Sequence, residues 1–107
     1  MVIRSLTDTY GNKFYYLGDL LHREDGPAAE YVCGANHYYY QGIRHRSNGP
    51  AIDDRYKVYY FHGKLHRLDG PAIEHPSGYK EWWVENNKIP VNSQIEFEKF
   101  LKLLAFI

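Results

Sequence analysis

Short runs of aromatic residues recur along the chain, and a pair of residues typical of tight turns follows each run. Tyr, Phe and Trp favour β-strands. The runs cover Phe14 to Leu17, His37 to Tyr40, Lys57 to Phe61 and Tyr79 to Glu85. The second residue of each following pair is Gly, Asp or Asn, which tolerate a positive φ in a hairpin turn. The pairs are Gly18-Asp19, Gln41-Gly42, His62-Gly63 and Asn86-Asn87. The pattern predicts a series of β-hairpins.

The hairpins are copies of one unit. His-Arg follows the turn in three units, with successive histidines (His22, His45, His66) lying 23 and 21 residues apart. Gly-Pro-Ala and an acid come next, as Gly26-Pro27-Ala28 with Glu30, Gly49-Pro50-Ala51 with Asp53, and Gly70-Pro71-Ala72 with Glu74. The fourth copy is decayed. We therefore predict a mainly β fold, an antiparallel stack of four hairpin repeats at about residues 1–25, 26–48, 49–69 and 70–91, in which each repeat contacts its neighbours.

The last segment, residues 92–107, has a different pattern. Ser93 and Glu96 are spaced as a capping box, which predicts a helix from Ile95 to Ile107. Eight large apolar residues follow on it, namely Ile95, Phe97, Phe100, Leu101, Leu103, Leu104, Phe106 and Ile107. One interpretation is that the helix caps the open end of the stack. The alternative is that its surplus apolar face pairs two chains or docks on a partner.

The repeated unit resembles the MORN repeat, in which an aromatic-rich strand, a turn glycine and a short His-containing segment lead to the next glycine. The form His-Arg-x-Asp/Asn-Gly-Pro-Ala is similar to the variant MORN repeats of viruses, phages and some bacteria. The resemblance covers roughly residues 8–91. It implies an elongated, twisted antiparallel sheet that is used for contacts rather than catalysis.

Composition narrows the classes of function. Thirteen Lys and Arg balance thirteen Asp and Glu, so the zero net charge argues against a nucleic-acid binder and a membrane-surface protein. The single cysteine, Cys33, allows no internal disulfide. No apolar stretch has the length of a signal peptide or a membrane span. We expect a cytoplasmic protein, in the host cytoplasm if it is viral.

The repeated His, Arg and acidic residues predict a structural role. Equivalent histidines two strands apart lie roughly 9–10 Å from each other, too far to converge on one metal ion. A set that occurs in three copies also lacks the asymmetry of a catalytic site. Each arginine instead precedes an acid by seven residues, and we expect ion pairs that fix the turn, between Arg23 and Glu30, Arg46 and Asp53, and Arg67 and Glu74. No cofactor, metal or catalytic residue is predicted.

Candidate binding residues lie where the repeats differ. Arg44 stands beside Tyr40 where the sister copies have leucine, and His62 has no counterpart. Trp82 and Trp83 give the last repeat its bulkiest aromatic surface. Trp, Tyr and Arg are enriched in binding hot spots. We predict these five residues as the binding set, with Trp packing under the C-terminal helix as the alternative for the tryptophans.

These observations favour a non-enzymatic protein-interaction module. The resemblance suggests a small phage or viral protein that binds and inhibits a host defence factor. The alternative is a nucleotide-binding or nucleotide-sequestering protein that acts as a dimer, with tyrosine faces for bases and arginines for phosphates. A homodimer would form through the C-terminal helix.

Overall fold

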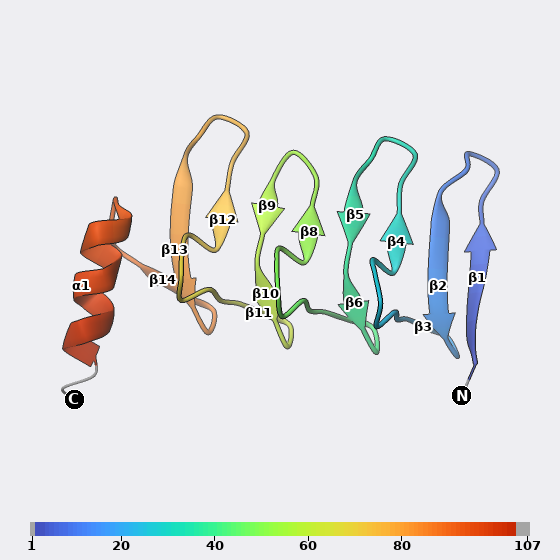
Figure 1. The fold of residues 1–107 in the computed structure, drawn as a ribbon, viewed down its shortest axis with the longest axis horizontal. Coiled ribbons are helices and arrows are strands. Elements are labelled where there is room, and N and C mark those ends of the chain that lie inside the picture. Colours follow the sequence, from blue (N-terminus) through green and yellow to red (C-terminus); the bar gives the residue numbers. More distant parts are fainter. Residues whose placement is uncertain (1, 105–107) are drawn as a thin grey trace.

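The aromatic runs lie in strands that stand side by side along the molecule. The computed structural model describes residues 2–104, which form a row of antiparallel hairpins ending in one helix (Figure 1). The row measures 49 × 32 × 18 Å. The predicted fold class, a mainly antiparallel β stack with one C-terminal helix, is confirmed.

The strands run in chain order across the sheet. They are β1 (Ile3–Thr7), β2 (Lys13–Leu17), β3 (Leu20–Leu21), β4 (Ala29–Glu30), β5 (Asn36–His37), β6 (Tyr39–Tyr40), β7 (Ile43–Arg44), β8 (Ile52–Asp53), β9 (Lys57–Val58), β10 (Tyr60–Phe61), β11 (Lys64–Leu65), β12 (Ile73–Glu74), β13 (Lys80–Val84) and β14 (Asn87–Ile89). The main sheet has the order β1-β2-β4-β5-β8-β9-β12-β13-β14. Below it in Figure 1, the short pairs β6-β7 and β10-β11 continue the middle aromatic runs to their turns. Two strands per repeat therefore separate equivalent positions.

Two-residue turns close the hairpins, as predicted, but the fourth turn lies one residue earlier than expected. It is Glu85-Asn86 (φ 45° and 68°), not Asn86-Asn87. The reason is the register, which pairs Trp82 with Ile89 so that both side chains are buried. In the first turn the positive φ belongs to Gly18 and not to Asp19. Positive φ at both turn residues gives a turn whose twist matches that of the strands.

Small residues make up the centre of the stack. Ala28, Ala51 and Ala72 are fully buried. Their carbonyl oxygens accept hydrogen bonds from the backbone N–H groups of the aromatic strands, at 2.8, 2.7 and 2.8 Å from Tyr15, Tyr38 and Tyr59. The space holds a methyl group and little more, which explains why alanine follows proline in each copy.

The helix α1 (Gln94–Leu104) covers the open end of the stack. The Glu96 N–H donates to Ser93 Oγ at 3.2 Å, which confirms the predicted N-cap. Phe97 is fully buried and packs with Trp82 and Ile89. Trp82 and Ile89 occupy the places that Tyr59 and His66 hold in the preceding repeat, so the last copy exchanges polar groups for a hydrophobic core. Of the predicted helix, residues 105–107 lie outside the described residues.

Candidate functional site

Each repeated histidine bonds to the next hairpin. The Nδ1 atom of His22 accepts the backbone N–H of Gln41 at 2.8 Å, and His45 accepts that of His62 at the same distance. His66 accepts the N–H of Glu85 at 3.1 Å. These three donors are the first turn residues, which have positive φ. The histidine of one repeat therefore holds the turn of its neighbour.

Each repeated arginine joins the aromatic strand of its own repeat to the Gly-Pro-Ala segment that follows. The guanidinium lies over a tyrosine ring, with 4.0, 3.9 and 4.0 Å from Cζ to the ring centre for Arg23 on Tyr15, Arg46 on Tyr38 and Arg67 on Tyr59. Its Nη1 atom donates to the carbonyl oxygens of Pro27, Pro50 and Pro71. The predicted acids lie 3.3, 3.9 and 3.5 Å away, so the ion pairs seven residues apart are confirmed. We call these arginines the clamp arginines.

Aromatic and imidazole rings alternate along the stack beside these histidines. Tyr40 lies 4.6 Å from His22 and 6.3 Å from His45, measured between ring centres. Phe61 lies 4.9 Å from His45 and 6.3 Å from His66. The five rings form a continuous line across three repeats, which we call the ring row.

Exposed apolar side chains follow the turn end of the same face. Tyr40 pairs with Ile43, as Leu17 does with Leu20, so these side chains share a face. Leu20, Tyr40, Ile43 and Phe61 are each about half exposed. They reach across to neighbouring hairpins: Leu20 lies against Gly42, and Ile43 against Gly63. We call these four residues the turn-edge stripe.

Three grooves lie between successive loops on this face. The first has a volume of about 690 Å³ and is lined by His22, Arg23 and Tyr40, among others. The second, of about 500 Å³, is lined by Tyr40, His45 and Arg46, and the third, of about 390 Å³, by Phe61, His66 and Arg67. Tyr40 therefore forms a wall between the first two grooves. The face that carries the grooves, the ring row and the turn-edge stripe is called the groove face.

The five predicted binding residues do not form one site. Tyr40 lies on the groove face, where His62 stacks on His45 at 4.3 Å. Arg44 pairs with Tyr39 and so lies on the opposite face, as Trp83 does. Trp82 is 4% exposed and donates from Nε1 to Gln94 Oε1, so it belongs to the core, as the alternative interpretation held.

Arg44 has an unusual setting on that opposite face. Its Cζ lies 5.7 and 5.8 Å from the ring centres of Tyr39 and Tyr60. Its Nε atom is buried and has no hydrogen-bond partner among the described residues. The contact with two tyrosine rings makes Arg44 part of the packing between two repeats.

Sequence reasoning missed most of the groove face. Leu20, Ile43 and Phe61 were passed over, although Phe61 aligns with Tyr40 in the repeat. That alignment could have identified Phe61 as a candidate binding residue. The grooves themselves lie between segments about 20 residues apart in the chain, and no single motif indicates them.

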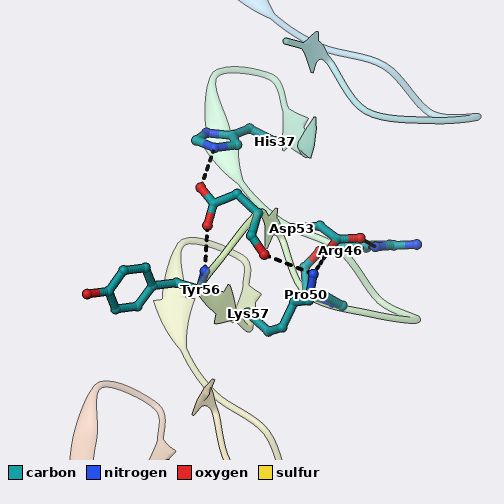
Figure 2. Close-up of polar contacts among 7 residues, drawn as sticks. His37, Arg46, Pro50, Asp53, Tyr56 and Lys57 are labelled. Carbon is teal, nitrogen blue, oxygen red and sulfur yellow. Dashed lines mark hydrogen bonds and ion pairs between the residues drawn. The ribbon is translucent and has the colours of Figure 1, made fainter. Parts of the chain in front are cut away.

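A second polar cluster links strand β5 of the second repeat to the loop between β8 and β9 in the third (Figure 2). Lys57 Nζ bonds to Asp53 Oδ1 and donates to the Asp54 carbonyl oxygen at 2.9 Å. The Asp54 carboxylate accepts the Tyr56 N–H at 2.7 Å and lies 3.3 Å from His37 Nε2. Within residues 2–104 no group of three His, Cys, Asp or Glu side chains is arranged to hold a metal ion. This cluster orders the loops.

No family model, curated protein or solved structure matches the chain. In the part of the chain that the structure describes, no helix is both long and apolar enough to cross a membrane.

Proposed function

We propose that this chain is a non-enzymatic protein-interaction module and that its groove face binds an extended segment of a partner protein. The observation that carries the proposal is the alignment of the half-exposed turn-edge stripe with three grooves on one face. Aromatic anchors beside pockets are the usual centre of a protein interface.

The spacing of the grooves favours an extended partner. Equivalent positions are two strands apart, roughly 9–10 Å. A polyproline II segment rises about 3.1 Å per residue, so every third residue of such a segment advances by about the same distance. One partner side chain in three would therefore meet an equivalent groove. Aromatic-lined grooves are a known way to bind such segments.

The stack is also organised before binding. Backbone hydrogen bonds join neighbouring repeats, for example from Arg46 N to Tyr60 O at 3.2 Å and from Gly63 N to Arg44 O at 2.9 Å. The histidine bonds add a side-chain contact at each junction. Little backbone entropy is lost when a surface of this kind binds, because these bonds already fix its backbone.

The nucleotide alternative has less support. It needs several arginines free to hold phosphates, whereas Arg23 bonds to Asp25 and Glu30, and Arg67 to Asp69 and Glu74. Of the three clamp arginines this leaves Arg46 alone with an Nε donor that is unbonded within the described residues. Asp25 lines the first and second grooves and Asp69 lines the third, and these carboxylates would repel a phosphate. The uncharged backbone and uncharged side chains of a protein segment meet no such repulsion.

The MORN-variant assignment, the phage or viral origin and the inhibition of a host factor stay predictions. The homodimer through α1 stays a prediction too. Ile95 and Leu103 are two-thirds exposed on that helix, but charged Glu98 and Lys99 lie between them in the sequence.

A peptide-library selection tests the proposal. Immobilised protein is offered extended random peptides, and bound peptides are measured again on Tyr40→Ser and Phe61→Ser variants. We expect enriched peptides that lose about tenfold or more in affinity on either variant, the loss typical of a hot spot. Tyr10→Ser is the matched control, because Tyr10 is an exposed tyrosine in the turn between β1 and β2. Peptides that bind all variants equally, or no enrichment at all, would reject the groove face.

A further inference from the structure

The three clamp arginines differ in how they are neutralised. In the first and third repeats, Nε donates to an aspartate two residues on, Arg23 to Asp25 at 3.0 Å and Arg67 to Asp69 at 2.9 Å. A second carboxylate, that of Glu30 or Glu74, lies within 3.5 Å of Nη1. Each outer guanidinium therefore contacts two carboxylates.

The middle clamp lacks the first of these contacts, and its ion pair with the second carboxylate is longer. Asn48 stands where the other repeats have aspartate. The nearest carboxylate, that of Asp53, is 3.9 Å from Arg46 Nη1 and is shared with Lys57, to which it bonds at a shorter distance, as Figure 2 shows. Arg46 Nη1 donates to the Pro50 carbonyl, but Nε has no acceptor within residues 2–104. The middle guanidinium thus has an Nε donor without an acceptor among these residues, and its charge is neutralised less than that of the other two, by one carboxylate that it shares with Lys57.

This donor can be reached from outside. The Arg46 side chain is 23% exposed, the same as that of Arg23. Arg46, Ser47 and Asn48 line both the second and the third groove, so they form the wall between them. The loop here is neutral, whereas the outer loops carry Glu24 and Asp25 or Asp69. Glu24 and Asp25 also line the second groove and Asp69 also lines the third, so an anion meets the least repulsion at the wall between them, which carries no carboxylate of its own.

We propose that Arg46 is a seat for a carboxylate of the partner protein, an Asp or Glu side chain that binds where Asp25 and Asp69 bind in the sister repeats. The proposal rests on the proposed function, since it names one feature of the segment that the groove face binds. The two outer repeats supply the geometry, a carboxylate oxygen about 3 Å from Nε with the guanidinium held flat on tyrosine. Hydrogen bonds of this kind are charge-assisted and among the stronger ones in proteins.

The Nε–H signals of the arginines in a ¹⁵N-correlated NMR spectrum test the seat directly. The probe is N-acetyl-glutamate α-amide, with N-acetyl-glutamine amide as the uncharged control. We expect the Arg46 signal to shift in a saturable way with the glutamate compound only, while the signals of Arg23 and Arg67 stay in place. No shift, an equal shift of all three signals, or a larger response to inorganic phosphate would overturn the carboxylate seat.

Asn48→Asp is the decisive variant, because it restores the residue of the sister repeats. The internal carboxylate should occupy the seat, abolish the Arg46 shift and raise the melting temperature. Arg46→Lys keeps the charge but removes Nε together with its NMR signal, so it is compared by peptide binding: it should weaken acidic peptides while circular dichroism reports an intact fold. On the selected peptides, N48D should weaken acidic ones by about tenfold, the value of a charged hydrogen bond. Peptides that are sensitive to Tyr40→Ser but not to N48D would overturn the seat and leave the proposed function standing.

Discussion

The Nδ1 atom of His45 accepts the backbone N–H of His62 at 2.8 Å, and the two imidazole rings stack with centres 4.3 Å apart. An acceptor nitrogen carries no proton, so the proton of neutral His45 lies on Nε2. His62 has the left-handed backbone of a turn residue, with φ at 49°. The bond therefore requires both the Nε2–H tautomer of His45 and the left-handed backbone of His62 in the next repeat.

We predict that acid weakens this junction. Burial lowers the pKa of His45, and the charge of His62 lowers it further. Above the ordinary histidine value of about 6.5, His45 is neutral in both the folded and the unfolded chain. As the pH falls below it, the unfolded chain takes up the proton first, so the free energy of unfolding decreases until the pH passes the lowered pKa of the folded state. Urea unfolding at several pH values measures how steeply the free energy of unfolding changes with pH.

The non-titrating variant His45→Gln is the control for that experiment. It should show a shallower fall in stability between neutral pH and mildly acidic pH than the unmodified chain. NMR of the imidazole should also report the Nε2–H tautomer at neutral pH. If the free energy of unfolding fell equally steeply with pH in both proteins, His45 would not be the cause of the acid sensitivity.

Loss of a repeated histidine should destabilise the stack. His22 is 3% exposed, and His22→Ala leaves the Gln41 N–H without its acceptor. An orphaned donor costs about 1–3 kcal/mol in the free energy of unfolding. His62→Asn is the comparison, because His62 is exposed and asparagine tolerates its positive φ; a change within about 0.5 kcal/mol is expected. Equal losses in the two variants would count against the histidine ladder.

The glycine of each Gly-Pro-Ala leaves room for the clamp arginine. A Cβ atom at position 70 would lie 2.6 Å from Arg67 Cζ. Gly70→Ala should therefore push the guanidinium off Tyr59 and away from Pro71, at a cost of about 1–2 kcal/mol for the lost stacking and hydrogen bonds. A double-mutant cycle with Arg67→Ala checks this, because Gly70→Ala should cost little once the arginine is gone. Additive losses would show that the glycine has another role.

The two neighbouring tryptophans should respond differently to truncation. Trp82→Ala removes a ring packed on Phe97 and should cost about 3–5 kcal/mol, with loss of helix signal from α1. Trp83 is half-buried on the other face, where its Nε1–H donates to Glu81 at 3.2 Å, and Trp83→Ala should cost about 1–2 kcal/mol. Chemical unfolding followed by circular dichroism compares them. A larger loss of stability for Trp83→Ala than for Trp82→Ala would contradict the placement of Trp82 in the core.

The sequence by itself determined the hairpin repeats, the clamp pairs and the helix start. These features are local: an aromatic run and its turn, an Arg seven residues from its acid, and Ser93 three residues before Glu96. Local contacts recur wherever their short pattern recurs, so three similar copies predict three similar structures. The absence of an acid at Asn48 was also visible in the sequence, by comparison with Asp25 and Asp69.

Only the tertiary structure decided what lies between the repeats. His45 could have bonded within its own hairpin, but the stack places the His62 turn against it. Pairing of Tyr39 with Arg44 separated Arg44 from Tyr40, and docking of α1 turned Trp82 from a surface candidate into core. Asp53 pairs with Arg46 but lies closer to Lys57. Each outcome depends on which surfaces meet when one hairpin packs on the next, and that geometry is fixed by the whole sheet and not by any one segment.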